Sequence, residues 1–217
     1  MIMKPTFKIT IYSFNLFAVT LLVYRMAKTE SPAYIFLAWN LFLAFIPFWI
    51  SNFLSEQPKF RYFHVPLLCT WLLFLPNSPY ILTDLFHLKQ WHGMPLWFDL
   101  VMVCSFALIG FVLLYKSIID VVHFFKKHLP GNYLNFSLPV LFLVIAFGLY
   151  LGRYLRFNSW DVMNHPFRLV KASYHTLLTK DTVGFTIIFA AFMWLVYLTL
   201  IHFNSKPASR EGRERSE

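Results

Sequence analysis

Residues 75–87 read LPNSPYILTDLFH and lie where the hydropathy of the chain predicts a membrane-spanning helix. Pro76 and Pro79 cannot donate backbone hydrogen bonds, so a helix that begins near Phe63 must loosen here. In hydrocarbon each freed carbonyl or amide costs several kcal/mol, so such a break survives only against protein or a water-filled cavity. The stretch therefore predicts a broken third span whose polar residues face the interior of a helical bundle.

The composition places the chain in a bilayer. Of its 217 residues, 58% are hydrophobic and only 13% are charged, which is outside the range of a soluble domain. Apolar runs recur along the whole chain and leave no polar block for a separate water-soluble core. We expect one membrane domain over residues 1–203, followed by a charged tail, 204–217, that is predicted to be disordered.

Six apolar stretches approach the roughly 20 residues that a membrane span needs. They predict an all-α integral membrane helical bundle with spans at about 8–25, 33–54, 63–88, 96–116, 133–152 and 183–203. The third span is broken at Pro76 to Pro79. In the connection after the fifth span, HPFRLVKASYHTLL separates apolar from basic residues at helical spacing. This pattern predicts an amphipathic helix in the membrane interface, with Pro166 in its first turn.

Polar residues follow the break at the spacing of one helix face. They are Asn77, Tyr80, Asp84 and His87. Asn77 or Ser78 is expected to cap the second half-helix, with Pro79 at its first position. The alternative is a simple kink followed by an ordinary helix end that meets headgroup water.

An up-and-down path of the spans brings polar residues to one membrane side. They are Asn40, Asn77, Tyr80, Asp84, His87, Asp99, Arg153, Arg156, Asn158 and Asp161. Arg153 and Arg156 are three residues apart, so we expect both on one helix face, where they would hold a phosphate, a lipid headgroup or carboxylates. The alternative is a pair of internal salt bridges to Asp84 and Asp99 that only fixes helix packing.

The same cluster offers residues for acid–base and metal chemistry. Asp84 and His87 are the candidate catalytic residues, because a carboxylate and an imidazole at this spacing can act as a base and its orienting partner. Asp161 with His165 has a similar spacing, but the sequence contains no HExxH motif and no cysteine cluster. We therefore predict no metal and no cofactor.

Membrane lipids are the expected partners. Lys and Arg flank apolar segments instead of forming an interleaved basic face, which argues against nucleic acid. With both termini in the cytoplasm, 11 Lys and Arg residues lie inside and eight outside, so this orientation is favoured. GLYLG at 148–152 permits close helix approach, either within the bundle or in a homo-oligomer through Gly148 and Gly152.

Four segments resemble the bacterial membrane protein family catalogued as domain of unknown function 1361: AWNLFLAFIP, LPNSPYILTDLFHL, PLWFDLVM and GLYLGRYLRFNSWDV. The resemblance runs from about the second span to the long loop. It implies a multi-pass protein of the bacterial inner or plasma membrane, with no activity established for the family. It marks the following as motif positions without assigning them a role: Asn77, Pro79, Tyr80, Asp84, His87, Asp99, Arg153, Asn158, Trp160 and Asp161.

Three functions stay open. In the first, Arg153 and Arg156 grip an anionic headgroup or a lipid-linked phosphate, Trp160 and the other polar residues complete the binding site, and Asp84 with His87 supplies acid–base catalysis. The second is a small-solute or proton-coupled transporter, because a broken helix is one way to bind a solute. The third is a structural or accessory membrane subunit whose polar cluster only locks the bundle.

Overall fold

The computed structural model describes residues 5–88, 93–128 and 133–205, and every regular element in these ranges is a helix. The long helices are α1 (Pro5–Thr29), α2 (Ile35–Glu56), α5 (Leu96–His128), α6 (Tyr133–Tyr154) and α9 (Lys180–Ser205). The shorter ones are α3 (His64–Phe74), α4 (Asn77–Thr83), the 3₁₀ helix η1 (Asp84–His87), α7 (Asp161–Asn164) and α8 (Pro166–Thr176). The predicted tail falls outside the described residues from 206 onward.

Six segments of the described chain are long and apolar enough to cross a membrane, with α3, α4 and the start of η1 forming one of them. The prediction of an all-α bundle of about six spans is therefore confirmed. α5 continues past the predicted end at 116 to His128. Its extension keeps a buried apolar stripe through Ile118, Val121 and Phe124, which continues the contact with the rest of the bundle.

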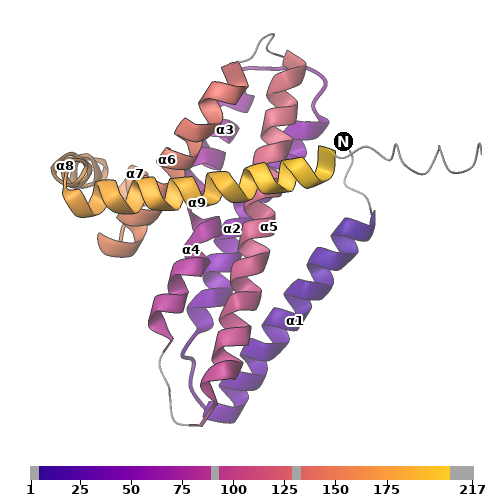
Figure 1. The fold of residues 1–217 in the computed structure, drawn as a ribbon, viewed down its shortest axis with the longest axis vertical. Helices are drawn as coiled ribbons and strands as arrows, with labels where there is room; N and C mark the ends of the chain where they lie inside the picture. The colour runs from indigo at the N-terminus through magenta and orange to yellow at the C-terminus, as the bar shows by residue number, and fades with distance from the viewer. Residues whose placement is uncertain (1–4, 89–92, 129–132, 206–217) are drawn as a thin grey trace, which may run out of the picture.

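α5 is the central helix, and α1, α2 and α4 pack against it. α6 and α9 form a second packed pair, and in Figure 1 α9 runs across α5 instead of along it. The Tyr115 hydroxyl of α5 donates to the Met193 carbonyl of α9 at 3.0 Å and joins the two parts. The start of α1 and the end of α9 lie toward the same side of the molecule in Figure 1.

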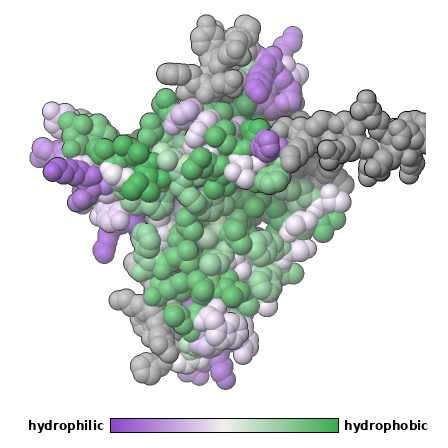
Figure 2. Space-filling model, in the orientation of Figure 1, coloured by the Kyte–Doolittle hydropathy of each residue, from purple (hydrophilic) through white to green (hydrophobic). Residues whose placement is uncertain are grey.

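Apolar side chains cover most of the visible face of the bundle, and hydrophilic residues gather at its extremities (Figure 2). α8 has the amphipathic character that the sequence predicts. Phe167 and Tyr174 on this helix are 90% and 79% exposed, so no described part of the chain covers them. An apolar face left open beside basic residues suits a helix that lies in the membrane interface.

The break in the third span is stabilised by side chains instead of a new helix cap. Leu75 and Pro76 separate α3 from α4 and keep right-handed helical backbone angles, and the N-cap Pro76 makes no side-chain hydrogen bond. The Asn77 amide instead donates to the Phe74 carbonyl at 2.9 Å. The expected capping of α4 by Asn77 or Ser78 is therefore wrong, because the groups that need partners are the last carbonyls of α3.

Glycine in the neighbouring helices lets the broken span come close. A Cβ on Gly110 of α5 would lie 2.4 Å from the Ser78 carbonyl oxygen, and one on Gly148 of α6 would lie 2.7 Å from Cγ of Pro76. A Cβ on Gly152 would lie 3.2 Å from the Tyr80 ring. Gly148 and Gly152 thus serve contacts within the chain, and a homo-oligomer through them stays a prediction.

Replacing Gly110 by alanine tests this close approach. The new Cβ meets a backbone oxygen that cannot rotate away, so we expect Gly110→Ala to lower the free energy of unfolding by about 1–3 kcal/mol. Gly184→Ala is the matched control, since no atom lies within 4 Å of the Cβ position there, and it should be neutral or stabilising by up to about 1 kcal/mol. Denaturant titration of the full chain in detergent measures both. Equal effects of the two substitutions would contradict the packing described here.

Candidate functional site

A largely buried ion pair joins three helices at the end of α6. Arg153 at the end of α6 donates through Nη1 to Oδ1 of Asp84 at 3.1 Å and through Nη2 to the Thr83 carbonyl at 2.7 Å. The Asn40 amide of α2 donates to Oδ2 of Asp84 at 3.1 Å. Asp84 is only 1% exposed, and both of its oxygens accept a hydrogen bond from a donor brought by another helix. The predicted alternative of an internal salt bridge describes this pair.

Asp84 does not line the pocket, but its carboxylate accepts hydrogen bonds from Asn40 and Arg153, which do. Its carboxylate orients Arg153, whose guanidinium group does line it. The side chain of His87, the other predicted catalytic residue, lies outside the described residues. Acid–base catalysis by these two residues therefore stays a prediction.

Asp99 belongs to a separate ion pair. Arg25 of α1 donates through Nε to Oδ1 of Asp99 at 2.7 Å and through Nη2 to Oδ2 at 3.1 Å, and both residues are 1% exposed. The Arg25 guanidinium also lies 4.3 Å from the centre of the Tyr34 ring. The expected pairing of Asp99 with Arg153 or Arg156 is thus wrong. Arg25, taken as a flanking charge, is long enough to reach back into the bundle from the end of its helix.

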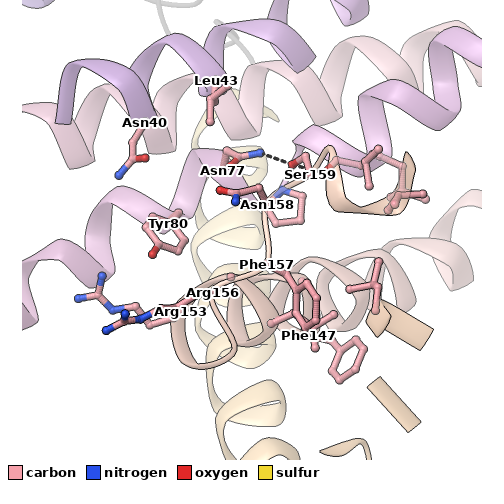
Figure 3. A pocket seen from close by; sticks show the side chains of 18 of the residues that line it. Asn40, Leu43, Asn77, Tyr80, Phe147, Arg153, Arg156, Phe157, Asn158 and Ser159 are labelled. Atoms are coloured by element: carbon pink, nitrogen blue, oxygen red, sulfur yellow. Dashed lines mark hydrogen bonds between the residues drawn. The ribbon is translucent and has the colours of Figure 1, made fainter. Parts of the chain in front are cut away.

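A pocket of about 890 Å³ lies between α2, the α3–α4 break, α6 and the segment that follows α6. Six residues predicted from the sequence line it: Asn40, Asn77, Tyr80, Arg153, Arg156 and Asn158. Figure 3 shows Arg153 and Arg156 extending toward one end of the pocket, beside Tyr80. None of the described lining residues is an aspartate or a glutamate, so the polar end presents cations and neutral donors.

Ser159, which the sequence analysis did not select, connects the two motifs that form the pocket. Its hydroxyl accepts a hydrogen bond from the Asn77 amide at 2.9 Å, drawn in Figure 3, and donates to the Leu73 carbonyl of α3 at 3.0 Å. The segment after α6 therefore supplies a donor to the break in the third span. The only sign of this role in the sequence is that Ser159, a small hydroxyl residue, stands between the motif residues Asn158 and Trp160.

Trp160 and Asp161 support the pocket wall without lining it. The Trp160 ring packs edge-on against Trp39, a lining residue, with ring centroids 6.4 Å apart. Oδ2 of Asp161 accepts a hydrogen bond from the backbone amide of Asn158 at 2.7 Å. The ring contact holds the segment between α6 and α7 against α2, and the hydrogen bond fixes the turn within that segment.

Arg156 has a backbone conformation that non-glycine residues rarely adopt. Its φ is +58°, and the amide of Phe157 donates to the Leu151 carbonyl at 3.2 Å. A left-handed residue two positions after the last helical residue, Tyr154, occupies the C′ position of a common helix ending, where glycine is the usual residue. The prediction that Arg153 and Arg156 share one helix face is therefore wrong, because α6 has already ended. Both side chains reach the pocket all the same.

The Arg156 side chain lines the pocket. It makes no hydrogen bond or ion pair with any of the residues that the structure describes. The Tyr80 hydroxyl likewise makes no hydrogen bond within these residues; the guanidinium of Arg153 lies 5.6 Å from its ring centre. Within the same residues, no group of three or more His, Cys, Asp or Glu side chains is arranged to hold a metal ion.

The fold and the pocket define a multi-pass helical membrane protein with an arginine-bearing pocket beside the break in its third span. Residues 39–196 match the family described as "Protein of unknown function (DUF1361)", and the chain belongs to this family. The matched range includes the broken span, both arginines of the pocket and Ser159. Comparison with curated proteins and with solved structures gave no match.

Double-mutant cycles test the pairing of the buried charges. We expect Asp84→Asn with Arg153→Gln, and Asp99→Asn with Arg25→Gln, to show coupling of about 0.5–3 kcal/mol in the free energy of unfolding, because each pair is in contact. Asp99→Asn with Arg153→Gln is the control pair, and its effects should add within about 0.5 kcal/mol. Coupling between Asp99 and Arg153 that exceeds the other two would contradict the arrangement.

Proposed function

We propose that the pocket binds an anionic lipid headgroup or a lipid-linked phosphate, with Arg156 as the main contact and Arg153 beside it. The observation that carries the proposal is the guanidinium group of Arg156, which lines the pocket and has no partner among the described residues. Arg153 is already matched by Asp84. The polar end of the pocket therefore holds one exposed positive charge that no described residue compensates, and a bound anion would offset it.

The backbone of Arg156 supports a role for its side chain beyond stability. A left-handed conformation costs an L-residue about 1–2 kcal/mol, and glycine would avoid this cost. Strain of this kind is common at ligand-binding positions, where the side chain is needed for another purpose. An arginine at this helix ending would then be retained for the ligand that its guanidinium group binds.

Neighbouring donors favour phosphate over carboxylate. The Tyr80 hydroxyl and the Asn158 side chain have no hydrogen-bond partner in the described chain, and both residues line the pocket with Arg156. A guanidinium group presents several N–H donors in a planar fork. Together these groups offer more donors than the two oxygens of a carboxylate require, and a phosphate has oxygens for all of them.

Membrane location completes the proposal. We place the chain in a bacterial inner membrane with both termini in the cytoplasm, so that the arginine end of the pocket faces the non-cytoplasmic side. The excess of Lys and Arg on the terminal side supports this orientation. Two of the eight outer charges, Arg25 and Arg153, are buried in ion pairs, which makes the outer face less basic than the sequence count suggests.

Arg156→Gly separates binding from stability. The substitution relieves the left-handed backbone, so the free energy of unfolding should stay unchanged or rise by about 1 kcal/mol. Affinity of the detergent-purified chain for phosphatidic acid should fall at least tenfold, while affinity for the zwitterionic lipid phosphatidylcholine should not change. Lys171→Ala is the control, because it removes one exposed positive charge outside the pocket. Wild-type affinity in Arg156→Gly, as a purely structural subunit predicts, would overturn the proposal.

Cysteine labelling tests the orientation. With Cys69 and Cys104 replaced by serine, a single cysteine at Lys171 should react with a membrane-impermeant thiol reagent in intact cells. A cysteine at Lys59, between α2 and α3, should react only after lysis, because an odd number of spans, three, separates it from Lys171. Labelling of Lys59 but not Lys171 in intact cells would place the pocket's polar end in the cytoplasm instead.

A further inference from the structure

An anionic group alone does not account for the apolar half of the pocket. Leu72 of α3 and Val144 and Phe147 of α6 line it, and Figure 3 shows Phe147 away from the two arginines. The pocket encloses about 890 Å³, whereas one water molecule occupies about 30 Å³ of liquid. A phosphate group at Arg156 would therefore leave most of the volume to an apolar part of the same ligand.

A second, smaller cavity extends this apolar region along α6. It measures about 350 Å³ and is lined by Val140, Leu143, Val144, Phe147, Leu177, Val183, Thr186 and Ile187. Val144 and Phe147 also line the pocket, so the two spaces meet at these side chains. From Arg153 back to Val140 the helix rises by roughly 20 Å. That length exceeds half of a hydrocarbon core, about 15 Å.

The apolar region is open to the surrounding lipid. Leu72 is 39% exposed, and Leu143 and Val144 are 40% and 45% exposed, so no described part of the chain covers them. α3 and α6 form the two walls on which these residues lie. A hydrocarbon chain can therefore reach the pocket sideways from the bilayer while its headgroup stays at the polar end, and neither part passes through an unfavourable medium.

We infer that the ligand is an amphiphile with a phosphate headgroup and a single hydrocarbon chain that follows the Val140–Phe147 stripe of α6. The inference rests on the proposed function, since the phosphate is placed at Arg156 and Arg153. It adds that the apolar wall contributes to affinity. The stripe matches one chain, because residues at helical spacing on a single helix form one narrow track.

Three probes separate the headgroup from the chain: palmitoyl lysophosphatidic acid, glycerol 3-phosphate and palmitoyl monoacylglycerol. We expect the full chain in neutral detergent to bind lysophosphatidic acid at least tenfold more tightly than either of the others. Val144→Trp fills the junction of the two cavities, so it should weaken lysophosphatidic acid at least tenfold and leave glycerol 3-phosphate unchanged. Val23→Trp on α1 is the matched control at another exposed valine, 59% accessible and outside both cavities.

Different outcomes would overturn the hydrocarbon-chain site and the phosphate site of the proposed function. Equal, Arg156-dependent affinity for lysophosphatidic acid and glycerol 3-phosphate would keep the phosphate site and overturn the chain site. An effect of Val23→Trp as large as that of Val144→Trp would also overturn the chain site, since it would report a change in micelle partitioning. Monoacylglycerol binding as tight as lysophosphatidic acid, or no binding of any probe, would overturn the anion site as well.

Discussion

Two backbone carbonyls at the end of α3 determine how the rest of the pocket is built. Lipid offers no donors, so the Leu73 and Phe74 carbonyls must be satisfied by protein. Asn77 supplies one donor and Ser159 the other. Ser159 reaches Leu73 only if the segment after α6 folds back over the break, and this return places Arg156 at the turn. The pocket is the space between the broken span and the segment after α6 whose Ser159 donates to a carbonyl of that span.

Three arginines have different roles, although all three follow apolar segments in the sequence: Arg25, Arg153 and Arg156. Arg25 pairs with the buried carboxylate of Asp99, and Arg153 pairs with that of Asp84. Each ion pair joins one helix to another. Removing one member of such a pair leaves an uncompensated charge in a medium of low dielectric constant. Arg156 carries no such structural obligation within the described residues, and its strained backbone would be more stable with glycine. Arg25 and Arg153 therefore stabilise the bundle, whereas Arg156 is available to a ligand.

Hydropathy and proline spacing were enough to predict the six spans, the break and the amphipathic helix α8, because each follows from local composition and periodicity. Six of the predicted polar residues line the pocket, because the up-and-down path of the spans determines which helix ends share a side. The sequence could not predict which charged residues form ion pairs with each other. Asp99 had several arginines within topological reach, and only the packing of α1 against α5 selects Arg25. Ser159 was missed because its role depends on which carbonyls the break exposes. Arg156 was predicted for the pocket but on the wrong grounds, because the end of α6 at Tyr154 gives no clear sign in GRYLRF.

The most direct measurement is the mass of whatever stays bound to the protein when it is extracted gently from its own membrane. Native mass spectrometry of the wild-type chain should show a single retained species whose fragmentation yields a phosphate ion and one hydrocarbon chain, and Arg156→Gly should lose it while keeping the folded charge-state distribution. Retention of only neutral lipids, or the same anionic species at the same occupancy in Arg156→Gly, would contradict the account of this pocket as a phosphate-amphiphile site.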